Sequence, residues 1–116
     1  MTESRYRVDF LMPNREHFER DKTRSILASV KRTLRERWRE VVEELYSTRC
    51  PNVYLLTADK SVSAGQQVAI IKYNIRLVVW DEVKEERFKE TPHVLSYSDW
   101  ARDELGHFIQ IWSRQA

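Results

Sequence analysis

The stretch KTRSILASVKRTLRERWREVVEELY, residues 22–46, carries the strongest periodic pattern in the chain. Its apolar residues recur at spacings of three and four, which is typical of an amphipathic helix. The stretch contains no glycine or proline, and Asp21 and Thr23 are both residue types that cap the start of a helix. We therefore predict a long helix over residues 22–46, with a buried stripe made of Ile26, Leu27, Val30, Leu34, Trp38, Val41, Val42 and Leu45.

The stretches on either side of this helix favour strands. Residues 5–12 alternate between polar and apolar side chains, which indicates a half-buried strand that ends at Pro13. Residues 53–58 begin with a short apolar run that is consistent with a buried strand. Residues 68–80 have one apolar face and lack the glycine that a two-residue hairpin turn at residues 73–74 would favour. We therefore predict one long strand there, paired antiparallel with residues 53–58.

The last predicted element is a second helix over residues 98–113. Its apolar side chains recur at helical spacing, and Ser96 with Asp99 three residues later resembles a capping box. The order is then strand, helix, strand, strand, helix. We predict an α+β fold for a single domain, residues 1–116, with a small antiparallel or mixed sheet and both helices packed on one face. The residues expected to be mostly buried are Val30, Leu34, Trp38, Ile71, Leu77, Phe108 and Trp112.

Composition excludes several classes of protein. Hydrophobic residues make up 41% of the chain, and a disordered chain would be poorer in them. The single cysteine excludes a disulfide framework and a cysteine-based zinc cluster. No apolar run approaches the roughly 20 residues that span a bilayer, and the charged N-terminal segment lacks the features of a secretory signal. We therefore expect a cytoplasmic, intracellular protein without a membrane partner.

The sequence offers little that is typical of an enzyme. Gly65 and Gly106 lie too far apart to form a phosphate-binding loop. Asp59 followed by Lys72 in the predicted strand resembles the core of a metal-dependent nuclease, but Ile70 stands where a second acidic residue is needed. We therefore predict a binding protein that is not an enzyme and that carries no metal ion or cofactor.

The total charge of +2 hides an uneven distribution of charged residues. Residues 20–39 contain eight basic and two acidic residues, whereas residues 81–104 contain eight acidic and four basic residues. On the predicted long helix the basic residues form a stripe beside the buried face, and such a stripe suits the phosphates of RNA or DNA. The residues predicted to bind nucleic acid are Arg24, Lys31, Arg32, Arg35 and Arg39.

Two other interpretations of the charges stay open. The stripe is also consistent with an ordinary solvated helix face that forms ion pairs along the helix. Alternatively, the basic and acidic segments meet across an interface, as in a protein-protein adaptor or a homo-oligomeric structural protein such as a homodimer. Four tryptophans exceed what one small core readily buries, so Trp80 and Trp100, at the edges of predicted elements, are the predicted interface residues. The excess of arginine over lysine, fourteen to six, is compatible with a thermophile or its virus.

Three segments resemble, in their order, the small protein subunits of ribonuclease P. They are Ser4-Arg5-Tyr6 at the opening of a strand, Ser25-Ile26-Leu27 near the start of a helix, and Ala69-Ile70-Ile71-Lys72 in a later strand. The predicted helix is longer than in that family, and the segment from Tyr97 to Trp100 replaces an expected glycine-rich segment. The resemblance implies a non-catalytic subunit that acts together with RNA.

Overall fold

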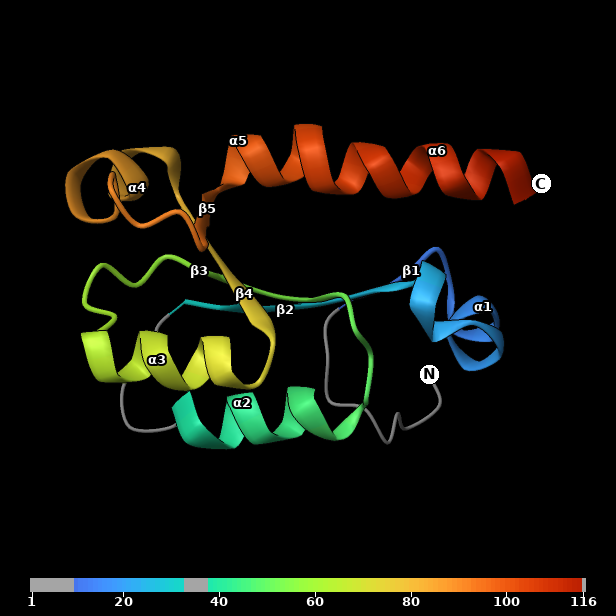
Figure 1. Cartoon of the computed structure of the whole chain (residues 1–116), viewed down its shortest axis with the longest axis horizontal. Helices are drawn as coiled ribbons and strands as arrows, with labels where there is room; N and C mark the ends of the chain where they lie inside the picture. Colours follow the sequence, from blue (N-terminus) through green and yellow to red (C-terminus); the bar gives the residue numbers. More distant parts are fainter. Residues whose placement is uncertain (1–9, 33–37, 116) are drawn as a thin grey trace.

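The computed structural model describes residues 10–32 and 38–115 (Figure 1). The strands are β1 (Phe10–Met12), β2 (Ile26–Lys31), β3 (Val53–Thr57), β4 (Ile75–Val79) and β5 (Val94–Ser96). The helices are α1 (Arg15–Arg20), the 3-10 turn η1 (Lys22–Arg24), α2 (Trp38–Ser47), α3 (Ala64–Lys72), α4 (Asp81–Arg87), α5 (Tyr97–Asp99), the π-helical segment η3 (Trp100–Leu105) and α6 (Gly106–Gln115).

The five strands form one mixed sheet in which the strand order follows the chain order. β1 pairs antiparallel with β2, and each later strand pairs parallel with the strand before it. Val53 of β3 lies between Leu27 of β2 and Ile75 of β4. Parallel neighbours need a crossover connection, and the segments that contain α2, α3 and α4 supply these crossovers. The expected fold class, a small α+β domain with a mixed sheet, is therefore confirmed.

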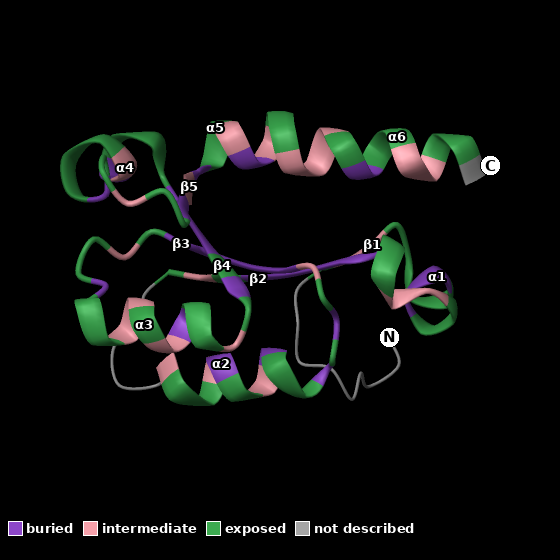
Figure 2. Ribbon diagram, in the orientation of Figure 1, coloured by how far each residue is buried: buried purple, intermediate pink, exposed green. Residues whose placement is uncertain are grey.

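Helices cover both faces of the sheet, so its central strands are buried (Figure 2). α2 and α3 lie on one face, and α5, η3 and α6 run along the other (Figure 1). Side chains alternate between the two halves of the core along each strand. Leu27 and Leu55 belong to the half under α2 and α3, whereas Ile26 and Tyr54 belong to the half that contains Trp100.

The first part of the predicted helix over residues 22–46 is wrong. Residues 26–31 form β2, and the helix that the structure describes begins at Trp38. The reason is that β2 is a strand covered on both faces, so it reads as a continuous apolar run instead of an alternating one. Its first four residues are all buried. A short run of this kind fits helical spacing as well as it fits a strand.

The first half of the predicted strand over residues 68–80 is also wrong, because α3 extends to Lys72. A capping box starts this helix: Gln66 N–H donates to Ser63 Oγ at 3.1 Å, and Ser63 N–H donates to Gln66 Oε1 at 2.8 Å. The helix is followed by Asn74 at a φ of 59°, a left-handed conformation that asparagine tolerates. β4 begins at the next residue, Ile75, and α3 returns the chain so that β4 pairs parallel with β3.

The final helix is confirmed, and Ser96 Oγ accepts a hydrogen bond from the N–H of Asp99 at 3.1 Å as the capping pattern predicts. It does not share a face with α2, because the two lie on opposite sides of the sheet (Figure 1). No helix within residues 10–32 and 38–115 is long and apolar enough to cross a membrane.

The predicted core is partly confirmed. Leu77 and Phe108 are 2% and 9% exposed. The prediction of burial is wrong for Val30 and Ile71, because these side chains are 47% and 45% exposed. Val30 lies in β2 instead of the predicted helix, and Ile71 lies in α3 instead of the predicted strand, so neither side chain is on the face that was expected to be buried. Of the remaining predicted core residues, Trp38 and Trp112 are half-buried against the core, and Leu34 lies outside the described residues.

Candidate functional site

The carboxyl ends of the parallel strands meet at one edge of the sheet, which is where open α/β sheets bind their ligands. β2 ends there at Lys31, and Arg32 follows directly. Thr57, the last residue of β3, donates a hydrogen bond from Oγ1 to the carbonyl oxygen of Arg32 at 3.4 Å. Lys31 is half-buried, Arg32 is exposed, and neither forms an ion pair with a described residue. This edge therefore presents cations whose charge is available to a ligand.

A pocket of about 570 Å³ opens at this edge. It lies on the face of the sheet that carries α5 and α6, because Leu56 and Val78 line it and belong to the core cluster on that face. Most of the lining is apolar. The residues that matter for its chemistry are the aromatic Phe10, Trp80, Tyr97 and Trp100 and the basic Lys31 and Arg32. We call this hollow the edge pocket.

Stacked aromatic rings form one wall of the edge pocket. The rings of Trp80 and Tyr97 are stacked, with centroids 5.6 Å apart and planes 28° apart. Tyr97 meets Trp100 edge to face at 5.9 Å, and Trp100 meets Tyr54 in the same manner at 5.7 Å. Trp80 and Tyr97 are 50% and 42% exposed, whereas Trp100 is 5% exposed. The buried Nε1 of Trp100 has no hydrogen-bond partner in the part of the chain that the structure describes.

A pair of hydrogen bonds joins the residues that follow Trp80 and Tyr97 in the chain. The backbone N–H of Ser98 donates to Asp81 Oδ1 at 3.0 Å, and the Ser98 hydroxyl donates to Asp81 Oδ2. These bonds join the start of α4 to α5, and Trp80 and Tyr97 are the residues next to them in the chain. The hydroxyl and the N–H of Ser98 hold the pKa of Asp81 below its ordinary value of 3.8.

We expect the packing of the two rings to depend on pH, because the two hydrogen bonds from Ser98 stabilise the ionised carboxylate of Asp81. Because the folded-state pKa is depressed, the stabilisation is present above pH 3.8 and is lost as the pH falls through the lower value. We expect Ser98→Ala to loosen the stacked pair at neutral pH, and the difference from the parent protein to vanish once the pH has fallen through the lowered pKa of Asp81. Near-UV circular dichroism measures this difference. Ser113→Ala on α6 is the control, and a difference that persists in strong acid would contradict the assignment.

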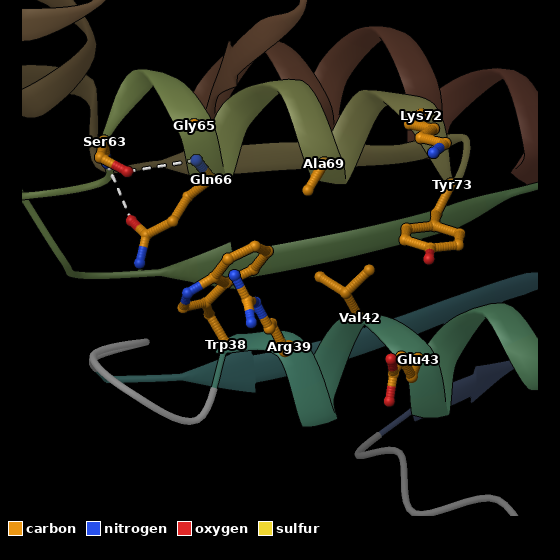
Figure 3. Close-up of a pocket in the computed structure, with 10 residues that line it drawn as sticks. All are labelled: Trp38, Arg39, Val42, Glu43, Ser63, Gly65, Gln66, Ala69, Lys72 and Tyr73. Atoms are coloured by element: carbon orange, nitrogen blue, oxygen red, sulfur yellow. Dashed lines mark hydrogen bonds between the residues drawn. The ribbon is translucent and has the colours of Figure 1, made fainter.

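A second hollow, of about 600 Å³, lies between α2 and α3 on the other face of the sheet (Figure 3). Trp38 and Arg39 project from the start of α2 toward the first turn of α3 (Figure 3). The Arg39 guanidinium lies 5.3 Å from the centroid of a Trp38 ring and forms no ion pair with a described residue. Glu43 and Lys72 also line this groove, so its charges have both signs.

The predicted basic stripe is not continuous. Arg24 precedes β2 and Lys31 ends it, which separates the two by about 20 Å at roughly 3.3 Å per residue of extended chain. Arg24 is also ion-paired with Asp21 at 2.9 Å. Lys31 and Arg32 therefore lie together at the carboxyl edge, and Arg24 lies at the other end of β2. Arg39 lines the groove between α2 and α3. Arg35 lies outside the described residues.

The two predicted interface tryptophans differ in their surroundings. Trp80 is half-exposed on the wall of the edge pocket. Trp100 is covered by its own chain, including the rings of Tyr54 and Tyr97. Of the two, Trp80 alone has a ring that a partner can reach.

Tyr97 was missed from the sequence, although it stands beside Trp80. The available signal is that Trp80 directly follows Val79, the end of β4, and Tyr97 directly follows Ser96, the end of β5. Residues that follow neighbouring parallel strands lie together at the carboxyl edge. The signal was hidden because no strand was predicted over residues 94–96, where the structure has β5.

Within residues 10–32 and 38–115, no group of three or more His, Cys, Asp and Glu side chains could hold a metal ion. Asp99 and Asp103 of the last helix face Arg102, at 2.8 and 2.9 Å respectively. The described acidic residues therefore do not complete a metal centre.

Residues 1–100 match the family described as EcoRII C terminal. The type II restriction enzyme SsoII of Shigella sonnei is 36% identical over 92 residues, which cover 79% of this chain and 30% of SsoII. The fold is similar to that of metal-depleted Ecl18kI in complex with uncleaved DNA, with a TM-score of 0.83, 32% identity and coverage of 90% of this chain and 36% of that chain. It is also similar to the restriction endonuclease PspGI in a complex with substrate DNA, with a TM-score of 0.67, 25% identity and coverage of 86% and 46%.

The chain therefore spans about a third of the length of SsoII and Ecl18kI. The prediction that this protein is not an enzyme is wrong, because the relatives are a type II restriction enzyme and restriction endonucleases. The family that matches is also not that of the ribonuclease P subunits. Because the match extends over residues 1–100 of the 116, the chain belongs to the EcoRII C-terminal family.

Proposed function

We propose that this chain is part of a type II restriction endonuclease and that it binds duplex DNA at the carboxyl edge of its parallel strands. Membership of the EcoRII C-terminal family and the DNA complexes of two similar structures support this proposal. The pair of cations Lys31 and Arg32 at the carboxyl edge is the observation that assigns the proposed DNA binding to this surface.

These cations differ from several others on the described surface. Arg76 lies 2.7 Å from Glu104, and Arg102 lies 2.8 Å from Asp99, so their charges are already compensated. Lys31 and Arg32 have no such partner among the described residues. A phosphate that approached them would release counterions without first breaking an ion pair. We propose Arg39 as a third phosphate contact, on the rim of the groove between α2 and α3.

We further propose that Lys31 takes part in cleavage of the DNA backbone. Negative charge builds up on the phosphate oxygens during cleavage, and a fixed ammonium group at a half-buried position stabilises that charge better than water does. Ecl18kI was solved metal-depleted, which implies a metal ion in that relative. Because the described residues of this chain do not complete a metal centre, we derive no step through a metal ion.

Salt dependence tests the proposed contacts. If Lys31, Arg32 and Arg39 each neutralise one phosphate, log affinity for duplex DNA falls with log salt at a slope of about −2.7. We expect Arg32→Ala to reduce this slope by about 0.9 and to weaken binding equally on unrelated sequences, because a phosphate contact does not read bases. Fluorescence anisotropy of labelled duplexes over a range of salt concentrations measures both quantities.

Arg24→Ala is the matched control, since Arg24 is exposed but paired with Asp21 at the other end of β2. We expect it to leave the slope unchanged. An equal effect of both substitutions would show that the carboxyl edge is not the binding surface. Arg35 stays a predicted contact, because it lies outside the described residues.

RNA binding and the homodimer also stay predictions. For the homodimer, support is limited to Trp80, whose exposed ring is available to a second copy, because Trp100 is buried in its own chain.

A further inference from the structure

We propose that Thr57 is a positioning residue for DNA binding: its buried hydroxyl fixes the backbone of Arg32, so that the Arg32 guanidinium reaches a phosphate at the carboxyl edge. This inference rests on the proposed function, because it assumes that Arg32 contacts DNA. It assigns a part in binding to a neutral side chain that acts through another residue.

Thr57 stands beside the end of β2. In the parallel pairing of β2 and β3, Thr57 lies opposite Lys31, and Arg32 is the next residue along the chain. The Thr57 hydroxyl donates to the carbonyl oxygen of Arg32 at 3.4 Å and accepts from the backbone N–H of Asp59 at 3.0 Å. One hydroxyl group therefore joins the first residue after β2 to the loop that follows β3.

The hydrogen bond to Arg32 is the longer of these two bonds. Hydrogen bonds at functional sites are often long in the free protein and tighten when the ligand is bound. Thr57 is 6% exposed, so its hydroxyl lies where backbone groups need a partner from the protein. Without the hydroxyl, the Arg32 carbonyl and the Asp59 N–H must find other partners. The backbone of Arg32 therefore moves when the hydroxyl is lost.

The loop at the other end of this connection is itself held in place. The backbone N–H of Ser61 donates to Asp59 Oδ1 at 2.8 Å. Val62 is buried in the core cluster under α2 and α3, and Ser63 caps the start of α3. The Thr57 hydroxyl therefore couples Arg32 to a segment that is anchored in the core.

Arg32 depends on a fixed backbone because of its surroundings. Its side chain is exposed, and it lines the edge pocket together with Lys31, a neighbour of like charge. The two cations repel each other, so a backbone that is free to move would let the side chains diverge. A phosphate that bridges them would then have to order both the backbone and the side chain. A backbone that is already fixed reduces the conformational entropy lost on binding.

Thr57→Val removes the hydroxyl and keeps a side chain of similar shape. We expect the full chain with this substitution to bind duplex DNA about 3- to 8-fold more weakly than the parent protein in about 0.1 M salt, where the loss of one phosphate contact costs about eightfold. The slope of log affinity against log salt should also become shallower, toward the value of Arg32→Ala. Fluorescence anisotropy of labelled duplexes measures both quantities.

Two variants separate the hydroxyl at this place from a buried hydroxyl in general. Thr57→Ser keeps the hydroxyl and should bind as the parent protein does. Thr48→Val is the matched control, because Thr48 is also buried and its hydroxyl also donates to a carbonyl, that of Leu45, and accepts from an N–H two residues on, that of Cys50. Thr48 precedes β3 and so lies away from the carboxyl edge. Thr48→Val should leave affinity and slope unchanged.

A double-mutant cycle tests whether Thr57 acts through Arg32. Thr57→Val should weaken binding in the parent protein and have no further effect when Arg32 is already replaced by alanine. A role limited to general stability would weaken binding by the same factor in both backgrounds. Exchange of the Asp59 amide hydrogen, followed by NMR, reports on the hydroxyl directly and should be faster in Thr57→Val than in Thr57→Ser. Far-UV circular dichroism and thermal unfolding verify that each variant is folded.

The failure of this inference is distinguishable from the failure of the proposed function. Parent-like affinity and slope for Thr57→Val would overturn the role of Thr57, while duplex binding that weakens in Arg32→Ala would still support the proposed function. Equal effects of Thr57→Val and Thr48→Val would also overturn the role of Thr57. If the parent protein does not bind duplex DNA at low salt, the proposed function is wrong and the role of Thr57 is wrong with it.

Discussion

We expect Lys31→Ala to cleave duplex DNA about 10²- to 10³-fold more slowly than the parent protein, the usual effect of removing one group that stabilises charge in the transition state. Lys31 is half-buried at the end of β2, where solvent screens a charge less than on an open surface. The loss of duplex affinity should be much smaller, because binding loses only one phosphate contact. Rates of plasmid cleavage in a magnesium buffer, compared with affinities from anisotropy, separate the two effects.

Lys72→Ala is the control for this experiment. Lys72 is exposed at the end of α3. In the sequence it was the lysine that, together with Asp59, resembled the core of a metal-dependent nuclease. We expect this variant to cleave at the parent rate. A cleavage rate that drops for Lys72→Ala and not for Lys31→Ala would place the reacting phosphate at α3 instead of the carboxyl edge.

The second large effect concerns two adjacent isoleucines on α3. Ile70 is 1% exposed and packs in the core cluster, whereas Ile71 is 45% exposed. We expect Ile70→Ala to lower the free energy of unfolding by about 2–5 kcal/mol, through lost burial and the cavity that remains. Ile71→Ala should change it by less than about 1 kcal/mol, since alanine also has a higher helix propensity than isoleucine. Urea unfolding followed by circular dichroism measures both.

This pair of variants tests whether residues 68–72 form a helix, as in α3, or part of a strand, as the sequence pattern predicts. The two structures predict opposite effects of the two substitutions on the free energy of unfolding. In an extended strand with Ile71 on the buried face, Ile71→Ala would be the costly change and Ile70→Ala the mild one. That reversal would show that α3 is wrong. Similar losses for both variants would contradict the exposed position of Ile71.

Local signals in the sequence were sufficient for the last helix and for β3. The helix after Ser96 has a cap and a regular apolar stripe, and β3 has five successive buried residues between polar segments. The same capping pattern is present at Ser63 and Gln66, and Asn74 is a residue type that ends helices in the left-handed region. α3 was nevertheless mistaken for part of a strand, because its apolar residues continue into β4 with only two residues between the elements.

Parts of the site depend on pairings that no local pattern reveals. Lys31 and Arg32 were predicted on a helix face, whereas the structure places Lys31 at the end of β2 and Arg32 directly after it. Trp80 and Tyr97 are 17 positions apart, and they meet only because β4 and β5 run parallel and end at the same edge. The direction of a strand pair is set by the crossover between the strands, and residues 81–93 had no clear helical pattern from which to infer it. The parallel direction of the β4–β5 pair therefore depends on tertiary packing, which the local sequence pattern does not reveal.

The order of strands in the sheet also constrains how the chain reaches this structure. Leu27 pairs with Val53, Val53 pairs with Ile75, and Leu77 pairs with Val94, so these partners are 26, 22 and 17 residues apart in the chain. No two neighbouring parallel strands form a hairpin that could assemble alone. Each loop must close, with its loss of chain entropy, before the strands that it joins gain any contact. Folding should therefore be slower than in a helical domain of the same length, with apolar strands exposed to aggregation until the last crossover has docked.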